Sequence, residues 1–343
     1  MKKFYNKNKN KINIFILILI TILVLYFSLK DDFNSIVNQI LNIDIKYLLI
    51  TFVIIICFWL LRSITLHRFT KKFKNDNKYS SSLQLLLRTQ FFNAITPFST
   101  GGQPYQIYYL AKGGLSTTTS TGIIMQNFIV YQIALVLLGI FAVGYNFLNH
   151  VFPKDNMLQN LVLIGFIMNT LVIIVMFILS FNKKLNKVII KIGISILTKL
   201  HIVKDKQSKL NEWDEYINRF HKSAEVLLDD KWEFLLGVIY NMLALIFLYS
   251  IPVFLLYSMG DFTSFNFIEA IVTSAYVMLI GSFVPIPGAS GGLEYGFIAF
   301  YSIFGIENAK LTAIMLLWRF VTYYLGMIVG AIALNVKRVD KWE

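Results

Sequence analysis

The stretch Pro287-Gly-Ala-Ser-Gly-Gly-Leu-Glu-Tyr295 lies inside an apolar region near the C-terminal end of the 343-residue chain. Proline and glycine interrupt helices, yet the flanking residues 268–284 and 293–304 are as apolar as membrane spans. Non-helical backbone at membrane depth is tolerated only where it is buried in protein or lines a cavity. Glu294 adds a carboxylate, which is costly in that environment and usually functional. The stretch therefore predicts a broken helical segment that contributes to a functional site.

The same pattern occurs a second time, in Pro97-Phe-Ser-Thr-Gly-Gly-Gln-Pro-Tyr105. Both stretches contain a proline, then Ser/Thr-Gly-Gly, then a tyrosine at identical spacing, and both interrupt apolar sequence. A pair of Gly/Pro-broken segments in the two halves of a membrane protein points to a transporter's substrate site. The alternative is that both stretches are ordinary turns between spans, because glycine and proline are common in loops.

Composition identifies the class of protein. Hydrophobic residues make up 56% of the chain and charged residues only 15%, which predicts an all-α polytopic membrane protein. The net charge of +13 does not indicate a nucleic-acid partner, because the basic residues flank apolar runs. Cys57 is the single cysteine, the four histidines have no metal-ligand spacing, and no nucleotide-binding loop is present. We expect no cofactor, no metal site and no catalysed reaction.

The expected fold is a single integral membrane domain of residues 1–343. About six full spans are expected, at residues 12–29, 47–61 (extendable to 66), 121–145, 158–181, 234–259 and 311–334. Two re-entrant helical hairpins, at residues 83–115 and 268–305, enter from opposite faces. Residues 47–145 and 234–335 then form an inverted repeat, a recurrent transporter architecture. Residues 1–46 provide an anchor span and an external amphipathic segment, and residues 146–233 provide the fourth span and a cytoplasmic amphipathic segment.

The distribution of positive charge predicts the orientation. In this topology 26 of the 32 Lys and Arg residues are cytoplasmic, and the four outside are Lys30, Lys46, Lys154 and Lys310. We therefore expect both termini in the cytoplasm of a cell whose Lys-, Asn- and Ile-rich composition indicates a bacterium. An amphipathic helix on the inner membrane surface is expected within residues 182–231, where these residues share one apolar face: Trp213, Tyr216, Ile217, Phe220, Ala224 and Leu227.

The candidate site combines the two glycine-rich stretches with the ionisable residues expected inside the membrane, Glu294, Arg319 and Arg88. An arginine can bind phosphate oxygens bidentately, and a carboxylate can accept an amine. Backbone N–H groups at the glycines can attract an anion. The candidate substrate-binding residues are Glu294, Arg319, Arg88, Gly101, Gly102, Gly291, Gly292, Ser290, Thr100, Tyr105 and Tyr295.

Three structural alternatives are open at these positions. Glu294 can pair with an arginine simply to hold its hairpin in place, since charges inside membranes usually pair. The glycines can serve close helix packing. Arg62, at the inner end of the second expected span, is expected to be an interface anchor whose charged end reaches the membrane surface.

The chain resembles the integral-membrane flippase-like family found as the N-terminal region of lysylphosphatidylglycerol synthase/flippase. The resembling stretches are Gln90-Phe-Phe-Asn-Ala-Ile-Thr-Pro-Phe-Ser-Thr-Gly-Gly-Gln-Pro, Val284-Pro-Ile-Pro-Gly-Ala-Ser-Gly-Gly-Leu-Glu and Leu317-Trp-Arg-Phe-Val-Thr-Tyr-Tyr. The resemblance implies movement of aminoacylated phosphatidylglycerol or related lipids between leaflets. It also implies that Glu294, Arg319 and the two Gly-Gly pairs line a cavity. Since the sequence ends at Glu343, soon after the last expected span, lysyl-lipid synthesis is not expected.

We therefore expect a lipid flippase that moves a phospholipid, an aminoacyl-phospholipid or another lipid-linked headgroup. Its expected partners are membrane lipids, either anionic or aminoacylated phospholipids or glycolipids, and a homo-oligomer is compatible with the sequence. Two alternatives are open. One is a membrane-embedded lipid or glycosyl transferase that uses Glu294 as a base, although no paired catalytic group is evident. The other is an accessory membrane protein that transports nothing.

Overall fold

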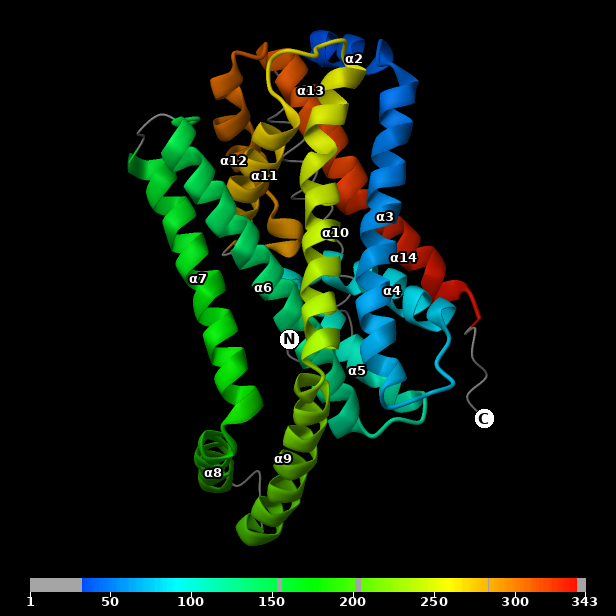
Figure 1. Cartoon of the computed structure of the whole chain (residues 1–343), viewed down its shortest axis with the longest axis vertical. Coiled ribbons are helices and arrows are strands. Elements are labelled where there is room, and N and C mark those ends of the chain that lie inside the picture. The colour runs from blue at the N-terminus through cyan, green and yellow to red at the C-terminus, as the bar shows by residue number, and fades with distance from the viewer. Residues whose placement is uncertain (1–32, 153–155, 201–204, 283, 338–343) are drawn as a thin grey trace.

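The computed structural model describes residues 33–152, 156–200, 205–282 and 284–337 (Figure 1). Every regular element in these ranges is helical. Among the described residues, five helical segments are long and apolar enough to cross a membrane: Ile45–Lys71 (α3), Thr117–Asn149 (α6), Met157–Ser180 within α7 (Asn156–Phe181), Lys231–Ser258 (α10) and Asn308–Asn335. The expected span at residues 12–29 lies outside the described residues. The all-helical membrane class is thus confirmed, and four of these five segments are longer than the sequence predicted.

Several helices begin where a side chain satisfies the free backbone N–H groups of the first turn. Asp44 accepts a hydrogen bond from the backbone N of Lys46 (2.9 Å) before α3, and Ser116 accepts one from Thr119 (3.0 Å) before α6. Asn266 forms a capping box at the start of α11 (Phe267–Gly281). These local signals fix the ends of the long helices.

Close packing holds the long helices together. Glycines allow several of the contacts, because a Cβ atom would collide with the neighbouring helix. A Cβ on Gly330 would lie 2.6 Å from the backbone N of Phe91, and one on Gly165 would lie 2.1 Å from the carbonyl oxygen of Leu279. The bundle core includes α3, α6 and α10, with buried side chains such as Ile55 and Leu245. These long helices pack against two shorter elements.

These shorter elements are helical hairpins that contain the two glycine-rich stretches. The first hairpin consists of α4 (Tyr79–Ala94), η1 (Pro97–Ser99) and α5 (Gly102–Lys112). The second hairpin consists of α11, η2 (Pro287–Ala289) and α12 (Gly292–Tyr301). The first occupies the lower half of the bundle in Figure 1 and the second the upper half, and the turns η1 and η2 contact each other. The two halves of the sequence therefore meet at their broken helices.

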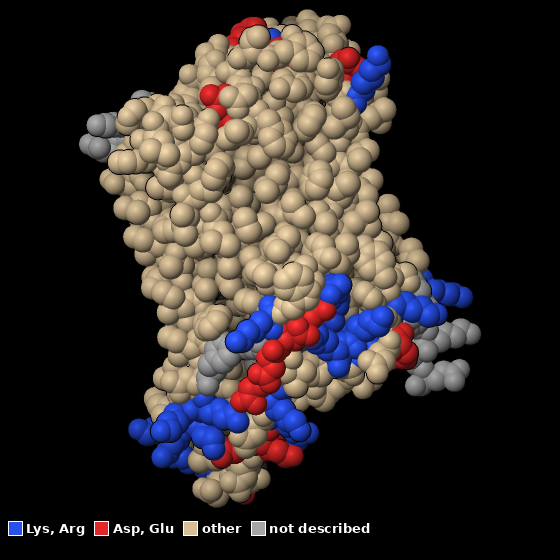
Figure 2. All heavy atoms as spheres, in the orientation of Figure 1, with Lys and Arg blue, Asp and Glu red and all other residues tan. Residues whose placement is uncertain are grey.

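Basic side chains gather at one end of the molecule. Figure 2 shows Lys and Arg concentrated at the lower end, below a broad band of this face that is free of charged side chains. At that end Arg68 of α3 pairs with Glu233 of α10 (Nε to Oε2, 2.7 Å), and Lys72 pairs with Asp230. The hydrogen bond from Lys72 holds the pKa of Asp230 below its usual range. The charge-free band has the character of a lipid-facing surface.

The two amphipathic segments pack part of their apolar faces against protein. The helix α9 (Lys206–Asp229) directs its apolar face toward protein, because Ile217 and Phe220 are buried and α9 packs against α6 and α8 (Lys183–Lys199). The hydroxyls of Tyr216 and Thr121 lie 3.0 Å apart. Similarly, Ile36 of α2 (Phe33–Leu41) is buried with two alanines of α13 (Asn308–Arg319). Protein therefore covers Ile217, Phe220 and Ile36, whereas Leu41 of α2 stays exposed.

Candidate functional site

The two glycine-rich stretches share backbone conformation as well as sequence. In η1, Phe98 and Ser99 both have φ of 53°. In η2 the corresponding residues, Gly288 and Ala289, have φ of 65° and 51°. Left-handed backbone costs a residue with a Cβ atom about 1–2 kcal/mol, so three of these four positions hold a strained conformation. The repeated sequence therefore encodes a repeated turn, which reverses the chain at each hairpin.

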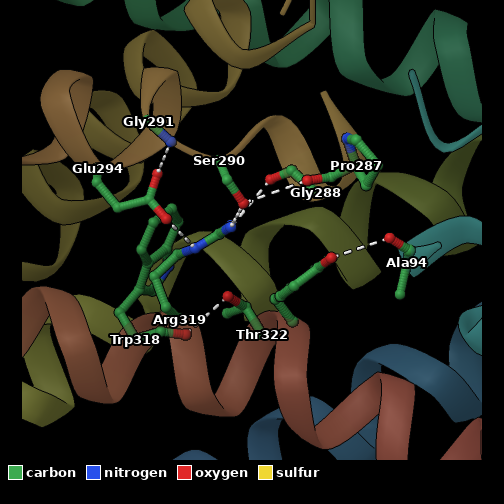
Figure 3. Close-up of polar contacts among 10 residues, drawn as sticks. Ala94, Pro287, Gly288, Ser290, Gly291, Glu294, Trp318, Arg319 and Thr322 are labelled. Atoms are coloured by element: carbon green, nitrogen blue, oxygen red, sulfur yellow. Dashed lines mark hydrogen bonds and ion pairs between the residues drawn. The ribbon is translucent and has the colours of Figure 1, made fainter. Parts of the chain in front are cut away.

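A buried ion pair lies beside the second turn (Figure 3). Oε1 of Glu294 lies 2.8 Å from Nε of Arg319, and both side chains are almost fully enclosed. The other carboxylate oxygen, Oε2, accepts a hydrogen bond of 2.7 Å from the backbone N of Gly291, at the start of α12. Both oxygens of Glu294 are therefore engaged by the protein.

Arg319 holds the turn itself. Its Nη2 donates to the carbonyl oxygen of Gly288 (3.0 Å) and to Oγ of Ser290 (3.3 Å), as Figure 3 shows. The ring of Tyr323 lies against the guanidinium, with 4.6 Å between its centroid and Cζ. The pairing that the sequence left open as a structural alternative is thus present. The pair neutralises its own charge in this conformation.

Tyr323 connects the two hairpins. Its hydroxyl donates a hydrogen bond of 2.9 Å to the carbonyl oxygen of Ala94, the last residue of α4. A Cβ on Gly288 would lie 2.4 Å from the Tyr323 ring, so the ring fits against η2 only because glycine stands there. Tyr323 belongs to the resembling stretch that begins at Leu317, but the sequence did not place it among the candidate binding residues. Its position four residues after Arg319 places both side chains on the same helix face.

The segment that carries Tyr323 is not an ordinary helix. Residues Phe320–Tyr324 form a π-helical turn between α13 and α14 (Leu325–Asn335), where the sequence predicted one continuous span. π-turns inside α-helices occur frequently at functional sites. The turn shifts the register of the helix immediately after Arg319.

Arg88 lies in a separate position. Its Nε donates to the carbonyl oxygen of Ala333 (2.9 Å) and its Nη2 to that of Val336 (2.6 Å). Its Cζ lies 5.4 Å from the ring centroid of Tyr109. The guanidinium therefore caps the C-terminal end of α14, where a cation is favourable because free carbonyl groups point outward. The structure does not bring Arg88 to the Glu294–Arg319 pair.

The glycines of both turns serve packing and internal hydrogen bonds. A Cβ on Gly102 would lie 2.1 Å from Oδ1 of Asn93, and one on Gly292 would lie 2.5 Å from Cγ2 of Val284. The backbone N of Gly101 donates to Oγ1 of Thr96 (2.8 Å). The close-packing alternative therefore holds for Gly102 and Gly292.

The remaining candidates surround the turns. Thr100 donates from Oγ1 to the carbonyl oxygen of Pro97 (2.9 Å), which closes the first turn. Tyr105 stacks on Phe92 with 4.2 Å between ring centroids, whereas Tyr295 is 55% exposed. Within the described ranges, no group of three His, Cys, Asp or Glu residues is arranged to hold a metal ion. The chemistry of the site is that of paired charges, tyrosines and backbone groups.

The chain was also compared with known proteins. A family model described as the lysylphosphatidylglycerol synthase TM region matches residues 14–330. The chain belongs to this family. Both hairpins, the Glu294–Arg319 pair and Tyr323 lie inside the matched region of this lysylphosphatidylglycerol synthase TM family protein.

Two curated relatives are archaeal proteins named UPF0104 membrane protein. The chain is 24% identical to that of Archaeoglobus fulgidus, over 84% of this chain and 85% of the relative. It is 23% identical to that of Methanocaldococcus jannaschii, over 90% of each chain. No solved structure matches the chain. The family expected from the resembling stretches is thus confirmed, and it identifies a multi-pass membrane protein.

Proposed function

We propose that this protein moves the headgroup of a lipid across the bacterial cytoplasmic membrane. One observation carries the proposal: the turns of two helical hairpins meet beside the buried Glu294–Arg319 pair. Tyr323, next to that pair, also donates a hydrogen bond to Ala94 of the first hairpin. The transmembrane family supports it, as does the charge-free band in Figure 2. Broken helices with buried charges at membrane depth are typical of substrate sites in transporters. In this proposal the hairpins are re-entrant and form the core of an inverted repeat.

The proposed orientation places the basic lower end of Figure 2 in the cytoplasm, with both termini on that side. The first hairpin then enters from the cytoplasm and the second from outside. The chain runs from Lys112 of α5 into α6 at the basic end, which is consistent with a hairpin that returns to its side of entry. Each hairpin would cover access to the site from one side.

The proposed transport cycle replaces internal contacts with contacts to the substrate. A phosphate-bearing headgroup competes for Arg319, and an ammonium on an aminoacylated headgroup competes for Glu294. Separating the pair without compensation is expensive, since each ion would stay buried and unpaired. A headgroup that carries the matching charge removes that cost. The substrates that fit are a phospholipid, an aminoacyl-phospholipid or another lipid-linked headgroup, with the acyl chains remaining in the bilayer.

We also propose that the protein catalyses no reaction. A transferase that used Glu294 as general base would need a free carboxylate within reach of its substrate. Both oxygens of Glu294 are engaged, by Arg319 and by the backbone of Gly291. Mass spectrometry of lipids incubated with the protein and candidate donors tests this directly, because a transferase would yield a product of altered mass.

The transport proposal is tested in vesicles that contain the purified protein and labelled lipids in both leaflets. A membrane-impermeant quencher reports how fast inner-leaflet label reaches the outer leaflet. We expect faster exchange with the wild-type protein than in empty vesicles, and loss of that exchange in Glu294→Gln. The matched control is Glu307→Gln, which makes the same change at an exposed glutamate. Exchange equal to that of empty vesicles, across labelled phospholipids and aminoacyl-phospholipids, would refute the proposal.

A further inference from the structure

Arg62 differs from the other arginines that the structure describes. It lies on α3 with Cζ 4.0 Å from the ring centroid of Tyr131 on α6 and 5.9 Å from that of Phe58. Its Nε is buried and has no hydrogen-bond partner, and no carboxylate in the described ranges pairs with it. By contrast, Arg68, Arg88, Arg219 and Arg319 each bind a carboxylate or backbone carbonyls.

The position of Arg62 does not fit the interface anchor that the sequence predicted. The charged end of α3 begins at Arg68. Arg62 lies six residues before it, about 9 Å along the helix axis. An anchor extends its charged end toward the membrane surface. The guanidinium instead lies on Tyr131, close to the middle of the 33-residue α6. A cation held at that depth without a charged partner is expensive, and such residues are usually functional.

Unpartnered polar atoms lie on the neighbouring helix turns. Asn127 precedes Tyr131 by one turn of α6, and its buried Oδ1 has no partner. Asn241 of α10 donates from Nδ2 to Oγ1 of Thr65 (3.3 Å), and Thr65 lies one turn after Arg62 on α3. The Oδ1 atom of Asn241 is also buried without a partner. Buried polar atoms without partners are rare in folded proteins. Here a free cationic donor and two free acceptors occur within one turn of the same helix junction.

We propose that Arg62, held on the ring of Tyr131, binds the phosphate group of an anionic lipid headgroup, with Asn127 and Asn241 accepting from the headgroup's hydroxyl or ammonium donors. A guanidinium stacked on a ring keeps its edge N–H groups available for bidentate contact with phosphate. While Arg319 stays paired with Glu294, as in this conformation, the unpaired positive charge that selects an anion is that of Arg62. This inference rests on the proposed function and specifies the charge of its substrate.

The test measures binding separately from transport. The full-length protein in uncharged detergent is titrated with short-chain phosphatidylglycerol, short-chain phosphatidylcholine and inorganic phosphate, with calorimetry as the readout. We expect the wild-type protein to bind phosphatidylglycerol about tenfold or more tightly than phosphatidylcholine, since a charge-assisted contact corresponds to at least that factor. Arg62→Gln is expected to abolish this preference. The control Lys71→Gln removes an equal charge from the exposed end of α3 and is expected to preserve it.

Two further variants distinguish the loss of the phosphate contact from a folding defect in Arg62→Gln. Arg62→Lys keeps the charge but loses the bidentate contact, so its affinity is expected to lie between those of the wild type and Arg62→Gln. Tyr131→Leu removes the supporting ring and is expected to weaken anionic-lipid binding while Arg62 stays in place. Unchanged affinity in Arg62→Gln, or equal affinity for the two lipids, would overturn the proposal. Arg62-dependent binding of inorganic phosphate without lipid binding would overturn the assignment to a lipid.

The outcomes also separate this inference from the proposed function. Transport in vesicles that persists unchanged in Arg62→Gln would refute the role of Arg62 and leave the flippase proposal standing. Arg62-dependent binding of phosphatidylglycerol by a protein that moves no lipid would support the site and refute the flippase proposal.

Discussion

The hydroxyl of Tyr323 donates a hydrogen bond to the carbonyl oxygen of Ala94, with 2.9 Å between the two oxygens. Ala94 ends α4 of the first hairpin, whereas Tyr323 lies beside Arg319, which holds the turn of the second. A single side chain thus joins the end of one hairpin to the ion pair of the other. Motion of the first hairpin away from Tyr323 breaks this contact, so the contact reports on coupling between that hairpin and the ion pair.

Replacing Tyr323 by phenylalanine removes the hydroxyl but keeps the ring on Arg319. The loss of one buried hydrogen bond is expected to destabilise the closed arrangement by about 1 kcal/mol. Hydrogen exchange of the backbone around Ala94 should then become faster than in the wild type. Tyr108→Phe makes the same change at an exposed tyrosine and should leave exchange there unaltered. If both variants exchange like the wild type, the contact does not couple the hairpins.

A double-mutant cycle tests whether Glu294 and Arg319 act as a pair. Glu294→Ala leaves a buried guanidinium without its carboxylate and should lower the unfolding free energy by about 3–5 kcal/mol. Glu294→Ala combined with Arg319→Met leaves no buried charge, so it should cost less than the sum of the two single changes. The midpoints of thermal unfolding in detergent are compared among the wild type, the two single variants and the double variant. Strictly additive losses would mean that the two side chains stabilise the turn independently.

The sequence offered this pair as one structural alternative, because charges in apolar surroundings usually pair with one another. It also predicted both broken helices, since proline and glycine interrupt helices wherever they stand. It could not predict what Arg88 binds. The carbonyl oxygens of Ala333 and Val336 lie about 250 residues further along the chain, and every helix end exposes such groups.

Two other features left no distinct pattern in the sequence. The π-turn at Phe320–Tyr324 falls in sequence as apolar and regular as its neighbours. The depth of Arg62 depends on where α3 ends: the sequence suggested an end near residue 61 or 66, whereas the helix continues to Lys71. Five to ten additional residues place Arg62 inside the helix instead of at its end, at about 1.5 Å per residue. An uncertain helix end therefore changed the interpretation of a functional candidate.

The glycines of the second turn offer a matched pair of substitutions. Gly288 has φ of 65° and its added Cβ would lie 2.4 Å from the Tyr323 ring, whereas at Gly291 (φ of 87°) nothing lies within 4 Å. Gly291→Ala should therefore cost the backbone strain alone, with no side-chain clash. Gly288→Ala carries the strain and also displaces Tyr323, so its thermal midpoint should be lower than that of Gly291→Ala. Equal midpoints would show that the turn accommodates the added methyl group without displacing Tyr323.

The junction of α8 and α9 should weaken in acid because of His221. This side chain is buried, and Nε2 lies 3.0 Å from Nδ2 of Asn186, an arrangement that suits a neutral ring accepting a hydrogen bond. Burial, helped by the charge of Lys183, lowers the pKa of His221 below its usual 6.5, against the opposing influence of Glu225. Below pH 6.5 the unfolded segment therefore binds a proton that the folded segment resists, so stability falls as pH falls.

Hydrogen exchange across α8 and α9 at pH 7.5 and pH 5.5, corrected for intrinsic rates, measures this effect. We expect full protection at the higher pH and reduced protection at the lower pH in the wild type. In His221→Asn an amide occupies the position without titrating, so protection should no longer depend on pH in this range. A wild-type protein equally protected at both pH values would show that the folded ring accepts a proton as readily as the unfolded one. Loss of protection in acid that persists in His221→Asn would assign the effect to another group.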